Sequence, residues 1–478
     1  MVWLWIYWII LSVAVYFIPA NSIKGTALTL IPAVSMFIYV YVSRDFLQGF
    51  CFGTILLIEM MNKGRTPVVF INSMLGQLTD SDNMFMLLTF FTCGATISAL
   101  HKSGSAKSFG VWMAKKIKNK KLNLIATFIM TALMSVDDYI NSLTVGTAMT
   151  PINDEAGIPR EMTSYVIRSS NSAPGLFYPF GDWAYFIILQ LVSLKLAKDL
   201  SHAVPLYMSF VPYLFYPMVV MLVSLLVIFG VIPKIGKMKD AYHRVETGGG
   251  VLSPNSKEDV DEEVEELLRQ KDVNPINFAI PVLTLFAGMI LTHFNGVQAG
   301  ILTLVVTGLL YIPQGIFTLN EYVQVMMDGF KDMLDLSLLL VFGYMIGDSM
   351  SALGFSDFIV GVARHALIPQ LLPVVVFLLF CCTEYLCTLN WTLYIIAMPI
   401  LFKVCPAIGA NLPLTIAALI SAGLFGSNTC IFSDGGVVVS KGSRIDLYDH
   451  GFSSMPYMII AGVASAVLYL GAGFVFHV

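Results

Sequence analysis

The chain has 478 residues, of which 57% are hydrophobic and 12% are charged, and its formal net charge is -4 at pH 7. Soluble proteins carry about 25% charged residues, so this composition excludes a soluble globular protein. The sequence instead predicts an all-α polytopic membrane protein whose surroundings are the lipid bilayer, and we expect no nucleic-acid partner.

Apolar runs that approach the roughly 20 residues needed to cross a bilayer follow one another along the chain. The predicted spans are 3–18, 25–42, 46–61, 83–100, 122–135, 137–152, 163–198, 205–232, 276–294, 297–313, 331–353, 369–384, 386–404, 411–440 and 453–475. The first span lacks a preceding basic region and a small-residue cleavage site, which indicates a membrane helix and not a signal peptide. The seven cysteines lie mostly inside apolar spans, so we expect neither disulfides nor a cysteine metal centre.

A long hydrophilic segment, 233–275, carries an acidic run and divides the chain into two halves. Each half has a span ending in Ser-Ala-Leu, an amphipathic piece, a pair of segments with an acid between them, and a long interrupted span. Paired interrupted segments are typical of transporters built from inverted repeats. We therefore predict two re-entrant hairpins, 122–152 and 369–404, and two broken transmembrane helices, 163–198 and 411–440.

These features divide the chain into predicted regions. They are N-terminal and scaffold helices at 1–82, a first repeat core at 83–232, an acidic linker at 233–275, scaffold helices at 276–330 and a second repeat core at 331–478.

Basic residues set the predicted orientation of these regions. Lysines between 107 and 121 and Arg160 flank the first hairpin, and more lysines follow the span 205–232. We therefore expect a multi-pass protein of the cell (inner or plasma) membrane with its N-terminus and the 233–275 loop in the cytoplasm. The second hairpin has few flanking charges and would enter from the opposite side.

The first hairpin contains adjacent acids in an otherwise apolar or small-residue run. A carboxylate at the centre of a bilayer costs roughly 3 kcal/mol on insertion scales, so a proton, a cation or a basic group must neutralise it. Asp137, Asp138, Asn141 and Thr144 place oxygen ligands within two helical turns, and sodium prefers such a set. The metal hypothesis is thus sodium on Asp137, Asp138 and Asn141. Alternatively, one of the acids caps the following helix.

The first broken span supplies further candidates. Pro174 and Gly175 interrupt the helix, so the freed carbonyls must line a cavity or find protein partners. The candidate ligands are Ser169, Ser170, Asn171, Ser172 and, after a second break, Asp182, which alternatively caps the next helix. Arg168 is either an internal counterion for Asp137 or Asp138, the reading we favour, or a bidentate clamp for a substrate carboxylate.

The second half repeats the pattern with different residues. Its candidates are Glu384, Thr388, Asn390 and Trp391 in the hairpin, and Gly426, Ser427, Asn428, Thr429, Ser433 and Asp434 around the predicted break. Glu384 is alternatively a solvated acid near the outer surface, and Asp434 alternatively a helix cap.

Two stretches, DDYINSLTVGTAMTPI and FGSNTCIFSDGGVVVSKGSRIDLYDHGFSSMPY, resemble the NhaC-type sodium/proton antiporter family of the wider ion transporter superfamily. The resemblance implies the inverted-repeat fold and a homodimer. It also implies that Asp137, Asp138, Asn141 and Thr144 belong to the transport site. The chain departs from the family at Arg168, Asp182, 384–389 and 426–428, so charges have moved around the cavity.

We therefore expect a secondary active transporter and not an enzyme, because no nucleotide-binding loop, HExxH or GxSxG motif is present. The first hypothesis is a sodium/proton antiporter working by alternating access, with Asp137 and Asp138 as the ion and proton site. The alternative is a sodium- or proton-coupled carrier or exchanger of a small organic ion, an amino acid or carboxylate, with Arg168 holding the carboxylate. Neither hypothesis calls for a cofactor besides the coupling ion, sodium or the proton.

Overall fold

The computed structural model describes residues 2–43, 45–114, 119–135, 137–256, 265, 273–355, 358–361, 368–387, 391–431 and 433–476. Every regular element in these ranges is a helix, which confirms the predicted all-α class. The predicted acidic run lies, apart from Glu265, outside the described residues.

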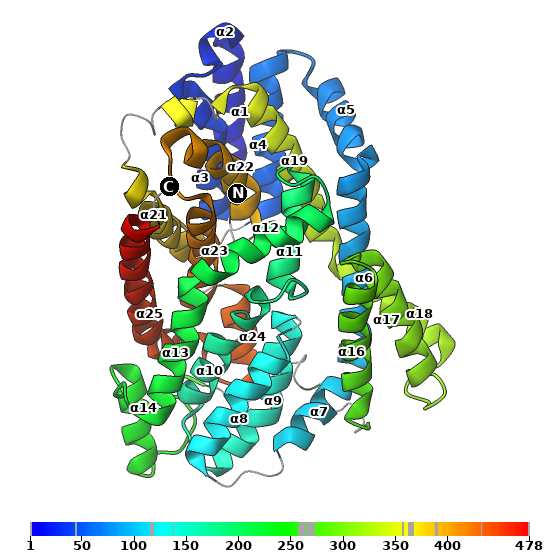
Figure 1. Cartoon of the computed structure of the whole chain (residues 1–478), viewed down its shortest axis with the longest axis vertical. Helices are drawn as coiled ribbons and strands as arrows, with labels where there is room; N and C mark the ends of the chain where they lie inside the picture. The colour runs from blue at the N-terminus through cyan, green and yellow to red at the C-terminus, as the bar shows by residue number, and fades with distance from the viewer. Residues whose placement is uncertain are drawn as a thin grey trace.

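The N-terminal helices occupy the upper half of Figure 1. They are α1 (Val2–Phe17), α2 (Ala20–Ile23), η1 (Ala27–Leu30), α3 (Ile31–Ser43), α4 (Phe46–Asn62) and α5 (Thr66–Thr79). Asp45 begins α4 by accepting the backbone N–H of Gln48, as an N-cap side chain does. The predicted spans omit α5, because Asn72, Ser73 and Gln77 interrupt its apolar run.

The next helices form the body of the molecule (Figure 1). They are α6 (Ser81–Lys102), α7 (Ser105–Ala114), α8 (Lys120–Leu133), α9 (Asp138–Glu155), α10 (Arg160–Ser170), η2 (Pro174–Leu176), α11 (Asp182–Ser193), α12 (Leu200–Phe210), η3 (Val211–Tyr213) and α13 (Phe215–Phe229). The predicted segment pair 122–152 is thus the pair α8 and α9. The predicted interruption of 163–198 lies between α10 and α11, because Pro174 has no N–H to continue the helix.

The second half returns to the same body. Its helices are α14 (Lys237–Glu246), α16 (Ile276–Leu291), α17 (Gly296–Tyr311), α18 (Leu319–Asp332), α19 (Leu334–Ala352), η4 (Pro369–Leu371), α21 (Leu372–Cys387), α22 (Trp391–Ile408), α23 (Leu412–Thr429), α24 (Asp434–Gly442) and α25 (Leu447–Val475). The segment pair predicted at 369–404 is α21 with α22.

One predicted interruption and one predicted uninterrupted span differ from the structure. The stretch 426–429 stays helical at the end of α23, and the break falls at 430–433. The reason is local, because the Ser433 hydroxyl caps α24 by accepting the Gly436 N–H. The span predicted as one helix at 205–232 is bent by 48° between η3 and α13, beside Pro212 and Pro217, which lack backbone donors.

Within the described residues, the helices that are long and apolar enough to cross a membrane are Ser81–Lys102, Leu319–Ala352, Leu412–Thr429 and Leu447–Val475. The bent pair Leu200–Tyr213 and Phe215–Phe229 adds one further span if both parts are taken together. The molecule is therefore an all-helical protein with several apolar spans and one bent pair.

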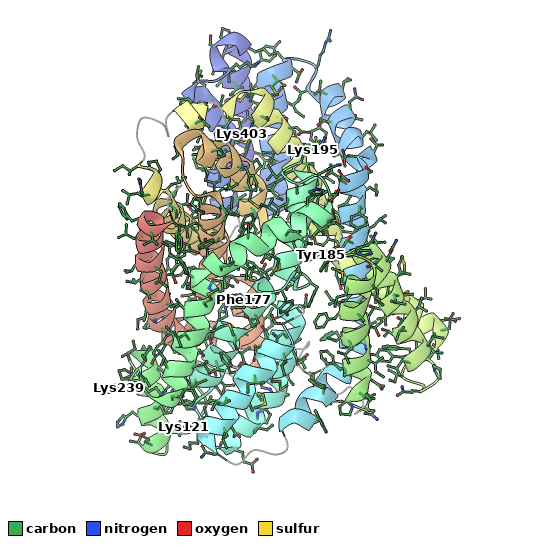
Figure 2. The ribbon with its side chains drawn as sticks, in the orientation of Figure 1. Lys121, Phe177, Tyr185, Lys195, Lys239 and Lys403 are labelled. Carbon is green, nitrogen blue, oxygen red and sulfur yellow. The ribbon has the colours of Figure 1, made fainter. Side chains whose placement is uncertain are left out.

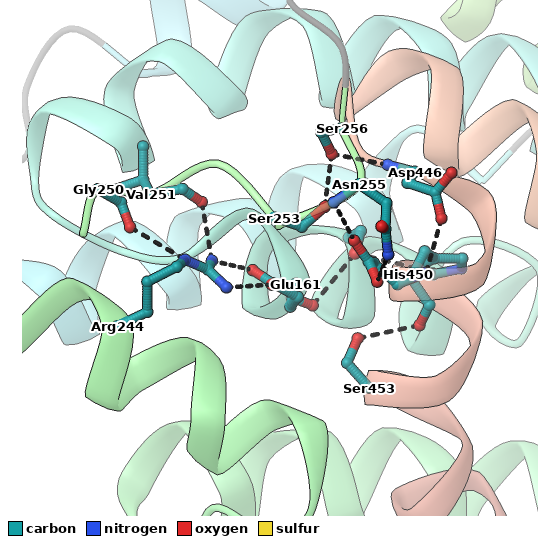
Figure 3. Close-up of polar contacts among 12 residues, drawn as sticks. Glu161, Arg244, Gly250, Val251, Ser253, Asn255, Ser256, Asp446, His450 and Ser453 are labelled. Carbon is teal, nitrogen blue, oxygen red and sulfur yellow. Dashed lines mark hydrogen bonds and ion pairs between the residues drawn. The ribbon is translucent and has the colours of Figure 1, made fainter.

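The lower end of α10 is fixed by a polar network (Figure 3). Arg244 of α14 forms a bidentate ion pair with Glu161 of α10, with both N–O distances at 2.9 Å. The carbonyl of Val251 accepts the backbone N–H of Arg160 and an N–H of Arg244. His450 of α25 contacts the Ser164 hydroxyl at 2.9 Å. Segments from three parts of the chain thus hold the beginning of α10.

Glycines bring helices of the two halves into backbone contact. A Cβ added at Gly146 of α9 would lie 2.6 Å from the carbonyl carbon of Gly442 in α24. A Cβ at Gly94 of α6 would lie 2.4 Å from the carbonyl oxygen of Gly329 in α18. Small residues permit this close approach, which is a common way to pack helices in membranes.

We expect Gly146→Ala to lower the free energy of unfolding by about 1–3 kcal/mol, because the added methyl group has no space. Gly471→Ala in α25 is the matched control, since an added Cβ there meets nothing within 4 Å. It should leave stability unchanged or raise it by up to about 1 kcal/mol. Thermal unfolding of both purified variants in detergent measures the difference, and equal stability of the two would contradict this packing.

Candidate functional site

Three carboxylates meet where the segment between α8 and α9 faces the segment between α10 and α11. Asp137 and Asp138 lie at the beginning of α9, and Asp182 lies at the beginning of α11. One carboxylate oxygen from each acid lies within 4.8 Å of the others. Like charges at this separation repel strongly, so the cluster favours a bound cation or bound protons. The sequence proposed Asp182 either as a ligand or as a cap, and the structure brings it to the acid pair.

The backbone around the break holds Asp182 close to the hairpin. A Cβ added at Gly175 would lie 3.0 Å from the Asp182 Oδ1 and 3.2 Å from the Ser135 Oγ. A Cβ added at Gly181 would lie 2.0 Å from the Gly175 carbonyl oxygen. The Tyr178 hydroxyl donates to the Ser135 carbonyl at 2.6 Å. Glycine is therefore required at position 181, where a Cβ would overlap the backbone, and a Cβ at position 175 would be tightly packed against Asp182 and Ser135.

Neutral donors orient Asp138. Its Oδ2 accepts the Ser172 hydroxyl at 3.0 Å and the Trp183 indole N–H at 3.2 Å. The backbone N–H of Asp138 donates to the Asp182 Oδ2 at 3.2 Å. The Ser172 backbone N–H donates to the Asn171 side-chain oxygen at 2.7 Å, and the Asn171 amide donates to the Ser142 hydroxyl at 2.8 Å. These contacts fix the carboxylate without adding a positive charge.

The side chains of Asn141, Ser169 and Ser170 donate to backbone carbonyls and not to the three acids. The Asn141 amide donates to the Thr131 carbonyl of α8 at 2.8 Å, which ties the two hairpin helices together. The Asn141 side-chain oxygen and the Thr144 hydroxyl are buried, and neither has a hydrogen-bond partner among the described residues. The Ser169 and Ser170 hydroxyls donate to the Val166 carbonyl of their own helix. We find no contact that links those two serines to the acids in the described part of the chain.

Arg168 is fully buried and turned toward the second half. Its Nη2 donates to the Ser433 hydroxyl at 2.7 Å and to the Ser427 hydroxyl at 3.4 Å. Within the ranges that the structure describes, Arg168 forms no ion pair within 4.0 Å, and its Nε and Nη1 have no hydrogen-bond partner. A Cβ at Gly435 would lie 1.9 Å from Nη1, so the guanidinium lies against the backbone of α24. Arg168 thus makes no direct ion pair with Asp137 or Asp138 in the described structure, and its favoured role as their internal counterion stays a prediction.

Of the second-half candidates, Ser427 and Ser433 contact Arg168, whereas Asn428 and Thr429 have other partners. The Asn428 amide donates to the Tyr216 hydroxyl at 3.3 Å, and Thr429 donates to the Phe425 carbonyl at 2.7 Å. Glu384 is buried on α21, where its backbone and Cβ lie against Gly426. Asp434 is exposed in the first turn of α24. Thr388, Asn390 and the side chain of Trp391 lie outside the described residues.

A cavity of about 680 Å³ reaches the acid cluster at Asp137. Its charged or titratable lining includes His101, Lys102, Asp137, Asp328, Lys331 and Asp332. Asp328 bridges Lys102 at 2.8 Å and Lys331 at 3.0 Å. The sequence interpretation missed these residues of α6 and α18, although charges beside apolar runs were a usable signal.

The comparisons with known proteins agree with this architecture. A family model described as the Na+/H+ antiporter family matches residues 186–474. The chain belongs to this family. It is therefore a multi-pass membrane transporter of ions or small molecules, and the family is one of transporters and not of enzymes.

More distant similarities extend over most of the antiporter-family chain. An uncharacterised protein of Haemophilus influenzae is 20% identical over 427 residues, which are 83% of this chain and 80% of that protein. The crystal structure of the Alcanivorax borkumensis YdaH transporter has a TM-score of 0.59 at 12% identity, covering 87% of this chain and 91% of that chain. MtrF of Neisseria gonorrhoeae, one of a class of antimetabolite efflux pumps, has a TM-score of 0.51 at 12% identity, covering 85% and 83%. These two similarities concern the fold alone.

The contacts of Ser433 predict a structural cost for its removal. Its hydroxyl caps α24, accepts from Arg168 and donates to the Ser427 carbonyl. We expect Ser433→Ala to lower the free energy of unfolding by about 2–4 kcal/mol, because a cap is lost and a buried guanidinium loses a partner. Ser440→Ala is the control on the same helix, since Ser440 donates only to the Val437 carbonyl. Denaturant titration should give a much smaller loss for it, and equal losses would contradict the assigned role.

Proposed function

We propose that this protein is a sodium/proton antiporter whose ion and proton site is the cluster of Asp137, Asp138 and Asp182. The observation that carries the proposal is the approach of three carboxylates within 4.8 Å at the wall of a polar cavity. Carboxylate oxygens are preferred ligands of hard cations, and the same oxygens accept protons. Sodium and protons would then compete for one site, which is the requirement for exchange.

The donors of the site support this assignment. Asp138 accepts hydrogen bonds from Ser172 and Trp183, and these neutral groups keep its carboxylate in place whether a cation or a proton is bound. The Asn141 oxygen and the Thr144 hydroxyl, buried on the same helix, are further candidate ligands. Sodium with a partial shell of carboxylate, amide and hydroxyl oxygens needs few waters from the cavity.

Arg168 contributes a fixed positive charge to this scheme. It is held by hydroxyl groups and not by an acid within 4.0 Å, among the residues described. Its field extends through a medium of low dielectric and lowers the energy of the ionised acids. When no cation is bound, the ionised carboxylates therefore cost less free energy with Arg168 nearby than they would without it.

The wider arrangement of the transporter is part of the proposal. The pairs α8–α9 and α21–α22 would be the two re-entrant hairpins, and α10–α11 and α23–α24 the two broken helices, of an inverted repeat with the region boundaries predicted above. Alternating access would expose the acids to one side at a time. We further propose a homodimer in the cell membrane with the N-terminus and the 233–275 loop in the cytoplasm.

Sodium should stabilise the purified protein, because a ligand that binds only the folded state adds about 2.7 kcal/mol at one hundred times its dissociation constant. The stabilisation should be larger at pH 8.5 than at pH 6, since protons compete for the same oxygens. We expect Asp138→Asn to abolish both the sodium-dependent thermal shift and sodium/proton exchange in proteoliposomes.

Asp240→Asn is the matched control, because Asp240 is exposed on α14 away from the cavity. It should keep the sodium shift and the exchange of the wild type. A wild-type protein that sodium does not stabilise at any pH between 6 and 8.5 would rule out the cluster as a sodium site.

A second candidate function rests on Arg168. The guanidinium of Arg168 is buried, and its Nε and Nη1 nitrogens have no hydrogen-bond partner among the described residues. A guanidinium is a strong donor to carboxylates. The second hypothesis is therefore a coupled carrier or exchanger of an amino acid or carboxylate, with the ammonium or coupling cation on the acids.

The two candidates differ in their response to carboxylates. Under the second hypothesis, a panel of amino acids, monocarboxylates and dicarboxylates should contain a compound that raises the melting temperature. Arg168→Lys should remove that shift while retaining the sodium shift, because lysine keeps the charge but not the planar fork. If no carboxylate stabilises the wild type, the sodium/proton exchanger is the remaining candidate.

A further inference from the structure

A second polar cavity lies at the far end of α11 from the acids. It has a volume of about 430 Å³ and is lined by residues of α5, α6, α11, α19 and α22. They include Ser193, Lys195, Tyr344 and Lys403. In Figure 2, Lys195 and Lys403 lie in the upper part of the molecule and Lys121 and Lys239 at its lower end. We call this space the outer cavity, and we call the cavity at Asp137 the inner cavity.

One helix connects the outer cavity with the proposed ion site. α11 begins at Asp182, in the acid cluster, and ends at Ser193, in the wall of the outer cavity. An α-helix rises 1.5 Å per residue, so Gln190 lies about 12 Å along the axis from Asp182. The stretch between them is buried throughout.

Next to Ser193 and Tyr344 in the wall of the outer cavity, side chains from three helices form a buried layer, which we call the floor. Met86 of α6, Gln190 of α11 and Tyr344 of α19 are 1%, 0% and 3% exposed. The Met86 sulfur receives contacts from the Tyr344 hydroxyl at 2.7 Å and the Gln190 amide nitrogen at 3.9 Å. One turn closer to the acids, the rings of Phe90 and Phe186 pack with centroids 6.0 Å apart. The floor is therefore buried, and it is apolar except for Gln190 and Tyr344.

The amide of Gln190 does not fit a permanently closed floor. One end of it meets a thioether, a weak acceptor, and the other end has no hydrogen-bond partner among the described residues. A fully buried amide oxygen without a partner costs free energy that leucine at the same place would not. A buried polar atom left unsatisfied in a native structure calls for an explanation, and an ion that binds it is one.

We propose that the side-chain oxygen of Gln190 is a ligand for the transported cation on the outer half of the pathway, and that Met86 and Tyr344 cover it while the inner cavity is open. The proposal rests on the proposed function, since it concerns the same ion. An amide oxygen is a suitable sodium ligand, whereas a thioether sulfur is not. The Ser193 and Tyr344 hydroxyls at the same floor are further oxygens for the ion once Met86 has moved.

The decisive variant is Gln190→Leu, which keeps the volume and removes the amide. We expect sodium/proton exchange in proteoliposomes to fall at least tenfold, while the sodium-dependent thermal shift, which reports the acid cluster, stays as in the wild type. Gln190→Asn keeps an amide and should recover part of the exchange. Gln48→Leu is the matched control, because both ends of the Gln48 amide are bonded, to Asp45 and Tyr39, far from both cavities. It should leave exchange per folded protein unchanged.

Thiol accessibility gives an independent test. Ser193→Cys should react with a membrane-impermeant thiol reagent from the outer-cavity side, and Gln190→Cys should react from the same side more slowly. Wild-type protein measures the reaction of the native cysteines.

Each result decides the proposal. Wild-type exchange in Gln190→Leu, loss of its sodium shift, equal loss of exchange in Gln190→Asn, or labelling of Gln190→Cys from the opposite side only would overturn it. If wild-type protein shows no sodium shift at all, the proposed function fails first, and that failure is visible without any Gln190 variant.

Discussion

The repulsion between Asp137, Asp138 and Asp182 is the interaction on which the rest of the structure depends. Three carboxylates whose oxygens lie within 4.8 Å of one another in a membrane-embedded body are unfavourable when all are ionised and empty. Their backbone is nevertheless fixed by the hairpin, the break between α10 and α11, and donors such as Trp183. Under the proposed function, this unfavourable charge is what a cation or a proton neutralises.

Close backbone contact makes this arrangement possible. Gly175 and Gly181 let two breaks in the chain approach each other beside Asp182. Gly146 with Gly442, and Gly435 with Arg168, join the first half to α24 in the second half. Without a side chain at these points, dispersion contacts between backbones replace the hydrophobic effect, which contributes little between helices surrounded by lipid. The acids themselves come from the first half, and the second half packs α24 against α9 and Arg168.

The two cavities differ in how they relate to the acids. The inner cavity reaches Asp137, whereas the outer cavity ends at the layer of Met86, Gln190 and Tyr344. α11 belongs to both, because it carries Asp182 at one end and Ser193 at the other.

The sequence by itself determined the helical membrane class, most helix positions and the antiporter family, because apolar runs and a close motif are local properties of the chain. It also singled out Asp137, Asp138 and the break at Pro174, since buried acids and helix-breaking residues are costly wherever they occur. Only the tertiary structure decided that Asp182 joins the acid pair, that Arg168 contacts Ser433, and that α23 continues to Thr429 before Ser433 caps α24. It also revealed Gln190 and the charges of α6 and α18. These features depend on which helices touch, and contacts between residues far apart in the chain leave no periodic signal in the sequence.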